Sequence, residues 1–272
     1  MKRRIIGLSA IILNFLLITI TTTAQSRFNK LVWSDEFDCQ SLMPDSNKWN
    51  YNVGDGCPKL CGWGNNELQY YTVARSENAR IQDGRLLIEA RKLNDEKHAY
   101  TSARLTSKFK GDWKYGRIEI RAKLPAGRGI WPAIWMLPTD PQHGGWPIDG
   151  EIDIMENVGY WPDSLFGTVH TEAYNGMKGT QKTKAISITD LSSSFHTYSV
   201  EWDANEIVFL VDQKPYNRFV NDGKGNIETW PFNQPFHLVM NVAVGGHWGG
   251  KFGVDDQIFP QRMEVEYVRV YQ

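Results

Sequence analysis

The chain has 272 residues, with 30 Lys and Arg against 31 Asp and Glu, so that its formal net charge is −1. This balance provides no basic surface for nucleic acid or for an anionic membrane, and it argues against a strongly anionic polysaccharide as a substrate. No linker rich in Pro, Ser and Gly, no low-complexity tract and no internal repeat interrupts the sequence, which favours one large domain over two small ones.

The first 24 residues have the features of a secretory signal peptide. Lys2, Arg3 and Arg4 precede an apolar run over 5–20, and small residues follow. The run is short for a membrane span and no basic stop-transfer cluster follows it. We therefore expect 25–272 to be a single exported domain, without membrane contact in its mature form, in the periplasm, at the cell surface or in the medium. Cleavage would leave 27 basic and 31 acidic residues, a net charge of −4.

Three cysteines follow the leader: Cys39, Cys57 and Cys61. An exported protein can form disulfides, and the odd number leaves one thiol over. Cys57 and Cys61 could close a small loop, but Cys39 could pair with either of them, so the pairing stays open. No cluster of His or Cys offers a fourth ligand at the spacing of a zinc site.

Short β-rich runs bounded by Gly, Pro, Asn and Asp recur along the remaining chain. The run 86–90 follows the turn residues Asp83 and Gly84, and 116–124 alternates apolar with charged residues. Further strands are predicted over 101–108, 130–136, 164–170, 196–202, 207–211, 236–244 and 263–271. Beyond the leader no long segment has helical periodicity. This pattern predicts an all-β antiparallel sandwich or barrel, whose curved sheets would offer a groove to a polymer.

Eleven tryptophans are a second signal, because many of them stand beside Gly or Pro. Trp63, Trp131, Trp146 and Trp248 are examples. A tryptophan in the middle of a strand usually packs in the core, whereas one held by glycines in a loop is more often presented at a surface. Flat apolar sugar faces bind flat apolar rings, so this distribution favours a carbohydrate ligand.

Three acidic residues lie close together in the stretch 145–159. Two isoleucines alternate with Glu151 and Asp153, which predicts a strand with the isoleucines in the core and both acids on the open face. Glu156 has the wrong parity for that face, and one extra residue would restore it. We therefore predict a β-bulge at 154–155 that brings all three carboxylates to one face.

Carboxylates gathered in this way repel one another unless a proton or a metal is shared. The arrangement fits a retaining glycosidase that needs no cofactor for catalysis, with Glu151 as the nucleophile and Glu156 as the general acid/base. Asp153 would orient Glu151 and tune which acid holds the proton. The spacing alone also fits a solvated acidic strand face or a calcium site. The surrounding tryptophans favour catalysis.

The stretch 151–157, Glu-Ile-Asp-Ile-Met-Glu-Asn, resembles the signature of glycoside hydrolase family 16 in its bulged form. Further stretches resemble bacterial laminarinases, in order, over nearly all of the chain after the leader: 33–37, 64–72, 100–105, 129–136, 167–170, 241–248 and 264–271. The resemblance implies a concanavalin-like β-jelly-roll of two stacked, curved antiparallel sheets with a substrate cleft on the concave face. It also implies a retaining endo-β-1,3-glucanase for laminarin-like chains, often with tolerance for mixed-linkage β-1,3/1,4-glucan.

The same resemblance assigns further residues to the substrate. Trp131 and Trp135 would form the sugar platform, Trp248 would stack from a facing loop, and the hydrogen bonds to the sugar or near the nucleophile would come from Asn66, Arg104 and His170. Other roles are open for three of these residues: Trp135 could lie in the core, Arg104 could form a surface pair with Glu119, and His170 could be structural.

The family also often binds a structural calcium on its convex side. Glu36, the carbonyl of Gly84 and an acid in the last strand would match its ligands, and Glu266 stands where an aspartate is more typical. We expect a monomer whose partner is a β-glucan.

Three other functions compete with this prediction. A glucan-binding lectin would need the groove but not the acids, and both glutamates are present. A same-family enzyme for agarose, carrageenan or porphyran is disfavoured by the laminarinase-like stretch 65–71. A transglycosylase differs only in whether sugar or water meets the glycosyl-enzyme, so the sequence leaves that choice open, together with glucan preference and tolerance of branches.

Overall fold

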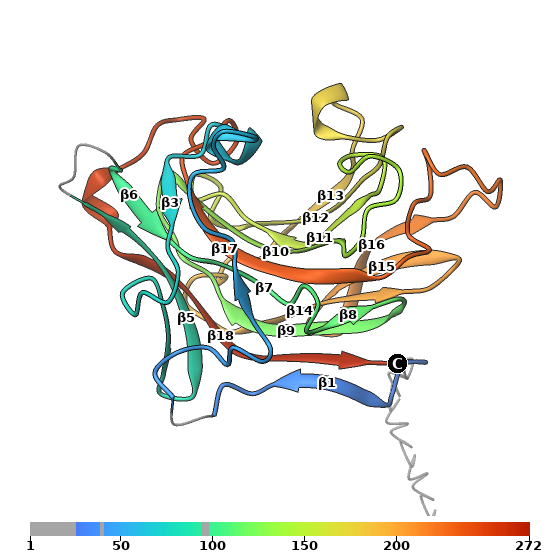
Figure 1. The fold of residues 1–272 in the computed structure, drawn as a ribbon, viewed down its shortest axis with the longest axis horizontal. Helices are drawn as coiled ribbons and strands as arrows, with labels where there is room; N and C mark the ends of the chain where they lie inside the picture. The colour runs from blue at the N-terminus through green and yellow to red at the C-terminus, as the bar shows by residue number, and fades with distance from the viewer. Residues whose placement is uncertain (1–25, 39–40, 94–97) are drawn as a thin grey trace, which may run out of the picture.

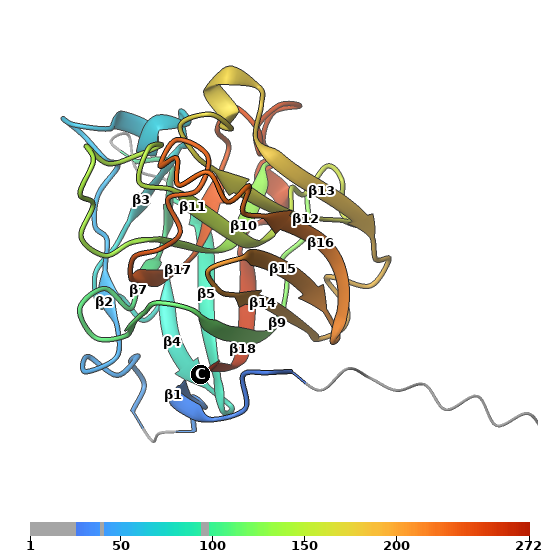
Figure 2. The ribbon, with the colours of Figure 1, turned by 90° about the vertical axis from the view of Figure 1, so that its right-hand side faces the viewer.

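Eighteen strands dominate the computed structural model, which describes residues 26–38, 41–93 and 98–272. They form two sheets stacked face to face (Figures 1 and 2). The predicted signal peptide, 1–24, and Cys39 lie outside the described residues. Within these ranges the all-β sandwich of two curved sheets is confirmed. No helix in this part of the chain is long and apolar enough to cross a membrane.

We call the two layers the outer sheet and the cleft sheet. The outer sheet has the order β16-β15-β14-β9-β18-β5-β6-β3, with β1 on β18 and β4 on β5, and the cleft sheet has the order β13-β12-β11-β10-β17-β7-β2, with β8 on β17. The outer strands are β1 Leu31–Asp35, β3 Gln69–Tyr71, β4 Ala79–Gln82, β5 Arg85–Lys92, β6 Tyr100–Ser102, β9 Gly116–Lys123, β14 His196–Trp202, β15 Glu206–Val211, β16 Lys214–Val220 and β18 Gln261–Tyr271. The cleft strands are β2 Asn50–Tyr51, β7 Arg104–Thr106, β8 Asp112–Trp113, β10 Ile130–Pro138, β11 Glu151–Glu156, β12 Ser164–His170, β13 Lys182–Ser187 and β17 Phe236–Val244. Three short 3-10 helices are η1 Cys61–Gly64, η2 Gly176–Lys178 and η3 Asp256–Ile258.

Most predicted strands agree with the observed ones. Those over 164–170, 196–202 and 236–244 coincide with β12, β14 and β17, and the others end within two residues of β5, β9, β10, β15 and β18. The single strand predicted over 101–108 is wrong. The chain leaves the outer sheet after β6, passes through the buried Ala103 and enters the cleft sheet as β7. Both parts bury residues, so the apolar pattern does not reveal this crossover.

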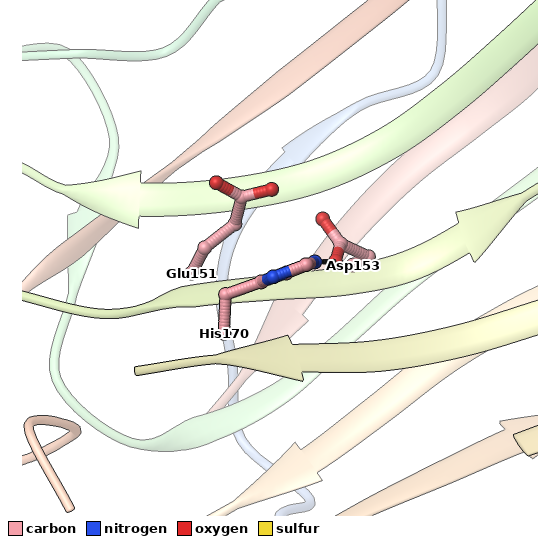
Figure 3. Close-up of side chains that lie close together, drawn as sticks. All are labelled: Glu151, Asp153 and His170. Carbon is pink, nitrogen blue, oxygen red and sulfur yellow. Dashed lines mark ion pairs between the residues drawn. The ribbon is translucent and has the colours of Figure 1, made fainter. Parts of the chain in front are cut away.

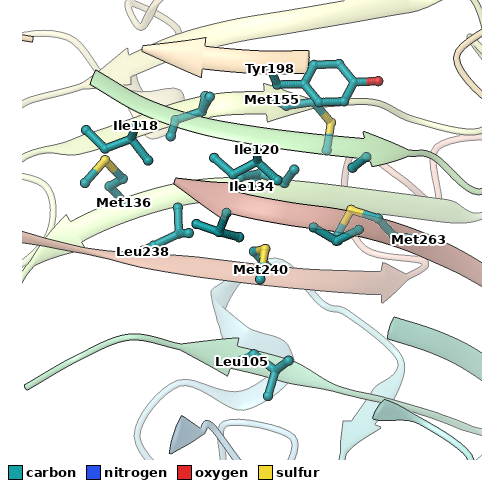
Figure 4. Packing of buried hydrophobic residues seen from close by; sticks show 14 of the residues in the cluster. Leu105, Ile118, Ile120, Ile134, Met136, Met155, Tyr198, Leu238, Met240 and Met263 are labelled. Carbon is teal, nitrogen blue, oxygen red and sulfur yellow. The ribbon is translucent and has the colours of Figure 1, made fainter. Parts of the chain in front are cut away.

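The apolar faces of the two sheets share one core. Side chains from β10 and β17 of the cleft sheet meet side chains from β9, β14 and β18 of the outer sheet (Figure 4). The members of this contact include Ile118, Ile120, Ile134, Met136, Leu238 and Met240, each fully buried. Because residues alternate between the two faces of a strand, this core leaves the other face of the cleft sheet to line a cleft.

The register of β11 confirms the predicted β-bulge. Against β12, Asp153 pairs with Thr168 and Glu156 pairs with Phe166, so that three steps along β11 match two along its neighbour. The pairing of β11 with its other neighbour, β10, shifts at the same place: Met155 pairs with Ile134, and Asp153 pairs with the next residue of β10, Trp135. Both residues between the two acids are buried in the core. The extra residue therefore returns Glu156 to the open face.

A disulfide between Cys57 and Cys61 answers part of the question that the sequence leaves open. It closes a short loop directly before the 3-10 helix η1, and Trp63 lies in that helix. In Figure 1 this helix, drawn as a blue coil, and the gold coil of η2 rise on opposite sides of the cleft sheet. The bridge therefore restrains a segment that borders the cleft.

Truncation of the shared core should destabilise the protein strongly. Ile134 on β10 is fully buried, so Ile134→Ala should lower the free energy of unfolding by about 2–5 kcal/mol. The matched control is Val220→Ala, since Val220 is 58% exposed and its loss should change stability by less than about 0.5 kcal/mol. Urea unfolding measures both values, and equal effects would contradict the assignment of the core.

Candidate active site

A cleft crosses the open face of the cleft sheet above the three acids. Strand pairing places Glu151 opposite His170 on β12, while Asp153 lies opposite Trp135 on β10. Residues from several elements line the cleft together with the acids: Trp63, Asn65, Glu67, Arg104, Trp131, Ala133, Trp135, Asn241 and Ala243. Residues far apart in the sequence thus meet on one surface, because the strands carrying them are neighbours in the sheet.

The three carboxylates disfavour one another's ionised forms. Burial raises the pKa of Glu151 to about 8, and the charge of Asp153 adds to this effect. Burial also raises the pKa of Glu156 to about 8, with repulsion from Glu151 as the second cause. The pKa of Asp153 lies well above its usual range because of burial and the charge of Glu156. Near neutral pH the cluster therefore holds protons.

Cationic and neutral neighbours distinguish the two glutamates. The charge of Arg104 opposes the rise in the pKa of Glu151. At Glu156 the opposing contact is neutral, a hydrogen bond of 3.1 Å from Nε1 of Trp131 to its Oε1. Positive charge therefore favours the ionised form of Glu151 over that of Glu156, although burial raises the pKa of both to about 8. A nucleophile and an acid require an asymmetry of this kind.

His170 bridges the acid cluster and the loop after β12. Its Nε2 lies 3.3 Å from Oδ2 of Asp153 (Figure 3), and its Nδ1 accepts a hydrogen bond of 3.2 Å from the backbone N–H of Gly176. Because Nδ1 accepts, the ring proton of the neutral imidazole is on Nε2 and faces Asp153. His170 thus contacts the cluster directly, and its role in substrate binding stays a prediction.

Glu151, Asp153 and His170 also offer one ligand atom each within 4.8 Å of one another, as no other such trio does among the described residues. A cation held there would occupy both carboxylates. The side-chain hydrogen bond between Glu151 and Asp153 already relieves their repulsion through a proton. Proton sharing therefore accounts for the geometry of this group without a metal.

Arg104 lies between two tryptophans. Its guanidinium is 4.5 Å from the ring centre of Trp63 and 4.6 Å from that of Trp135. Burial lowers the pKa of Arg104, and the charges of Tyr71, Glu67 and Glu151 oppose this effect. Its Nε is buried and has no hydrogen-bond partner among the residues that the structure describes. Cation–π contacts on both faces hold this charge at the cleft.

Two of the open alternatives are wrong. Arg104 makes no surface pair with Glu119, because Glu119 accepts a hydrogen bond of 2.9 Å from Tyr267 and pairs with Arg117 on the outer sheet. Trp135 is not a core residue, because its even offset from Trp131 puts both on the open face of β10. Its use as a sugar platform stays a prediction.

The sequence did not predict a hydrogen-bond network that connects to Trp135, one of the two tryptophans beside Arg104. Oε2 of Glu67 accepts from Nε2 of Gln69 at 2.7 Å and from Oη of Tyr71 at 3.4 Å. Nδ2 of Asn241 donates to the same Tyr71 oxygen at 3.0 Å, and Oδ1 of Asn241 accepts from Nε1 of Trp135 at 2.8 Å. A polar Asn241 inside the apolar run of β17 was the available signal, since buried polar groups need partners.

The other predicted substrate residues differ in position. Trp248 stands at the cleft, with its ring centre 5.4 Å from that of Trp131 in an edge-to-face contact. Asn66 is exposed and its Nδ2 lies 3.0 Å from Nε2 of His247, whereas the neighbouring Asn65 lines the cleft. The proposed contact of Asn66 with sugar stays a prediction.

A buried carboxylate also shapes the entry to β11. Asp149 is fully buried and accepts hydrogen bonds from the backbone N–H groups of Gln142, His143 and Gly145 at 3.0, 3.1 and 2.7 Å. Gly150 follows with φ 89°, and a Cβ there would lie 2.7 Å from Pro231. The loop and the glycine together fix where Glu151 begins the strand.

The groups predicted to hold calcium are engaged otherwise. Glu36 accepts from Nε and Nη2 of Arg269 at 3.0 and 2.8 Å, and this contact lowers the pKa of Glu36. Glu266 accepts from Nε of Arg121 at 2.6 Å. Arginines thus contact both carboxylates that were predicted to bind calcium together with the Gly84 carbonyl. Structural calcium stays a prediction.

Comparison with known proteins gives consistent matches. The family model for glycosyl hydrolases family 16 matches residues 66–269. A β-glucanase from Rhodothermus marinus is 54% identical over 249 residues, which cover 89% of this chain and 85% of the relative. The solved structure of the laminarinase from Rhodothermus marinus is 53% identical, with a TM-score of 0.85 and coverage of 89% and 97%. SCLam, a non-specific endo-β-1,3(4)-glucanase, is 48% identical, with a TM-score of 0.83 and coverage of 89% and 91%.

The raised pKa values predict that the acid cluster destabilises the fold at high pH. The folded state keeps protons on Glu151 and Glu156 up to about pH 8, whereas their ordinary pKa is 4.5. Folding therefore takes up protons between these values, and stability falls as pH rises through that window. A protein carrying both Glu151→Gln and Glu156→Gln should lose less stability than the wild type between pH 5 and pH 9.

Urea unfolding over this pH range makes the comparison. The control is Glu228→Gln, which removes an exposed glutamate and should reproduce the slope of the wild type. Parallel curves for the wild type and the doubly substituted protein would contradict the shared-proton cluster.

Proposed function

The chain belongs to glycosyl hydrolases family 16, and from this premise we propose that it hydrolyses internal β-1,3-glucosidic bonds of laminarin-like glucans with retention of configuration. The observation that carries the proposal is the acid cluster. Two glutamates share one face of a bulged strand, an aspartate lies between them, and the charge of Arg104 lowers the pKa of Glu151 but is not among the causes that act on Glu156. A retaining mechanism needs a nucleophile and an acid/base on the same side of the cleft.

In the first step the carboxylate of Glu151 attacks the anomeric carbon. The bond from that carbon to the glycosidic oxygen breaks, and Glu156 gives its proton to the departing oxygen. Arg104 favours the ionised nucleophile. Asp153, whose pKa lies well above its usual range, keeps a proton and donates it in a hydrogen bond to the ionised Glu151, which orients the attacking oxygen.

In the second step Glu156 acts as the base. Once Glu151 is an ester it carries no charge, so the repulsion that raises the pKa of Glu156 disappears. The pKa of Glu156 then falls, and its carboxylate takes a proton from water as the water attacks the anomeric carbon. The bond to Glu151 breaks, and the product has the configuration of the substrate. One pair of residues thus performs both steps because their charges are coupled.

The choice of substrate rests on the relatives. Among the proteins compared, one is named a β-glucanase and one a laminarinase, while SCLam is titled a non-specific endo-β-1,3(4)-glucanase. We propose laminarin-like β-1,3-glucan as the main substrate, with mixed-linkage β-1,3/1,4-glucan as a second one. A lectin function is disfavoured because both glutamates are present and share the open face.

We further propose an exported, monomeric protein. The basic and apolar character of 1–24 supports export, and so does the disulfide between Cys57 and Cys61, since such bonds persist in oxidising compartments.

Digestion of laminarin followed by proton NMR tests the reaction. The first reducing ends should be β-anomers, and α-anomers should follow by mutarotation; α-anomers appearing first would contradict retention. Glu156→Gln should lower kcat by about 10²–10⁴-fold, the usual contribution of a general acid/base. A wild type that binds laminarin and releases no reducing ends would establish the lectin instead.

Parallel digests with lichenan, agarose and carrageenan are the substrate control. Laminarin should be cut fastest and lichenan more slowly, with no products from the two galactans. Activity on a galactan alone would overturn the proposed substrate but not the mechanism.

A further inference from the structure

Aromatic rings continue from the acid cluster to the surface of the molecule. Trp248 contacts Trp131 and also Phe166, whose ring centre is 5.0 Å away in an edge-to-face arrangement. Phe166 in turn stacks with Trp161, at 6.2 Å between ring centres and an interplanar angle of 23°. Trp131 donates to Glu156, so an unbroken series of rings leads from this acid to Trp161.

Sheet order places these outer rings on one side of the acids. Phe166 pairs with Glu156 across β11 and β12, and directly paired residues point to the same face. Strand β12 lies on the far side of β11 from β10, β17 and β7 (Figures 1 and 2). Arg104, with its stacked tryptophans, belongs to β7. The acids therefore divide the cleft into a half above β7, β17 and β10 and a half above β12.

Trp161 is both exposed and firmly held. It is 48% exposed, yet the backbone around it is bound by Asn157, the residue after Glu156. Nδ2 of Asn157 donates to the carbonyl oxygens of Trp161 at 3.1 Å and of Ser164 at 2.9 Å, and Asn157 itself is buried. A preorganised ring loses little freedom when it binds a ligand.

Neighbouring rings extend this feature into a patch. Tyr160 contacts Trp161 at 5.3 Å and Phe252 at 4.9 Å between ring centres, and Phe252 is 55% exposed. Single exposed apolar residues are ordinary, whereas a contiguous patch at the mouth of a cleft marks a binding surface. Exposed rings of this kind add little to folding, because their outer faces remain in water.

We propose that Trp161 and Phe166 bind the leaving portion of the glucan, the sugar units on the reducing-end side of the bond that is cut. This inference rests on the proposed function and adds to it the residues that bind this portion. Glucose rings of the chain would stack their apolar faces on the two aromatic rings.

The contrast between the two halves of the cleft decides which portion binds where. The glycone stays on the enzyme as an ester between the two steps, and the half with Arg104, Glu67 and Asn65 offers polar groups to hold it. The leaving portion has to depart before water can enter. An open surface that holds sugar by stacking suits this release, because it adds few directional bonds that must be broken.

Two substrates separate this role from others. Laminarin fills both halves of the cleft, whereas 4-nitrophenyl β-laminaribioside has a leaving group that is a single phenol. Trp161→Ala should lower kcat/KM for laminarin by about 3- to 10-fold, the effect of losing one aromatic contact, and should change kcat/KM for the aryl substrate by less than about 2-fold. Trp161→Phe should recover most of the loss, because it restores a ring.

The matched control is Phe109→Ala, which removes a 75% exposed ring in the segment after β7, outside the ring contacts of the patch, and should leave both values unchanged. Equal losses on both substrates would overturn the inference and place Trp161 in glycone binding or in support of Glu156. Unchanged values for Trp161→Ala, in a wild type that cuts laminarin, would overturn this inference alone. A wild type that cuts neither substrate would overturn the proposed function as well.

Discussion

Repulsion among three carboxylates on one face of a buried strand is the constraint on which the rest of the structure depends. A regular strand would turn Glu156 towards the core, where an unpaired charge is very unfavourable. The bulge in β11 places it beside Asp153 and Glu151 instead. Buried side chains on the other face, such as Ile152 and Ile154, anchor the strand against relaxation of this repulsion. The core of the sandwich thus supports an arrangement that is unfavourable by itself.

The two glutamates have different surroundings, which supports the different roles proposed for them. Burial raises the pKa of both glutamates to about 8, but the positive charge of Arg104 lies on the side of Glu151. Arg104 can stand there without a direct carboxylate partner because Trp63 and Trp135 cover its two faces. The hydrogen-bond network from Glu67 through Tyr71 to Asn241 holds Trp135 by its indole N–H. Trp135 therefore helps to position the charge of Arg104 and also forms part of the proposed sugar-binding surface.

Much of this could be predicted from the sequence, because a strict period of two leaves few choices. The alternation around Glu151 and the wrong parity of Glu156 were enough to predict both the shared face and the bulge. The crossover at Ala103 could not be found in this way, since both sheets bury their residues there. Strand β13 was missed because it is an exposed edge strand rich in Lys and Thr, without an apolar face.

Side-chain partners were harder to predict than faces. Arg104 was correctly singled out, but the surface pair with Glu119 was a reasonable alternative until the fold placed the two on different sheets. The connection of Glu67 and Asn241 through Tyr71 could not be predicted, because it forms only where β17 lies beside the segment before β3. The arginines beside Glu36 and Glu266 come from strands that no local pattern links to them.

The most direct test of the account is to trap the covalent intermediate. A 2-deoxy-2-fluoro-β-laminaribiosyl fluoride reacts through its good leaving group and then hydrolyses slowly, so that the glycosyl-enzyme accumulates for mass spectrometry. The account predicts one added disaccharide per chain, attached to the peptide that contains Glu151 and located on that residue by fragmentation. A label on Glu156 or Asp153, or no label on a protein that cuts laminarin, would contradict it.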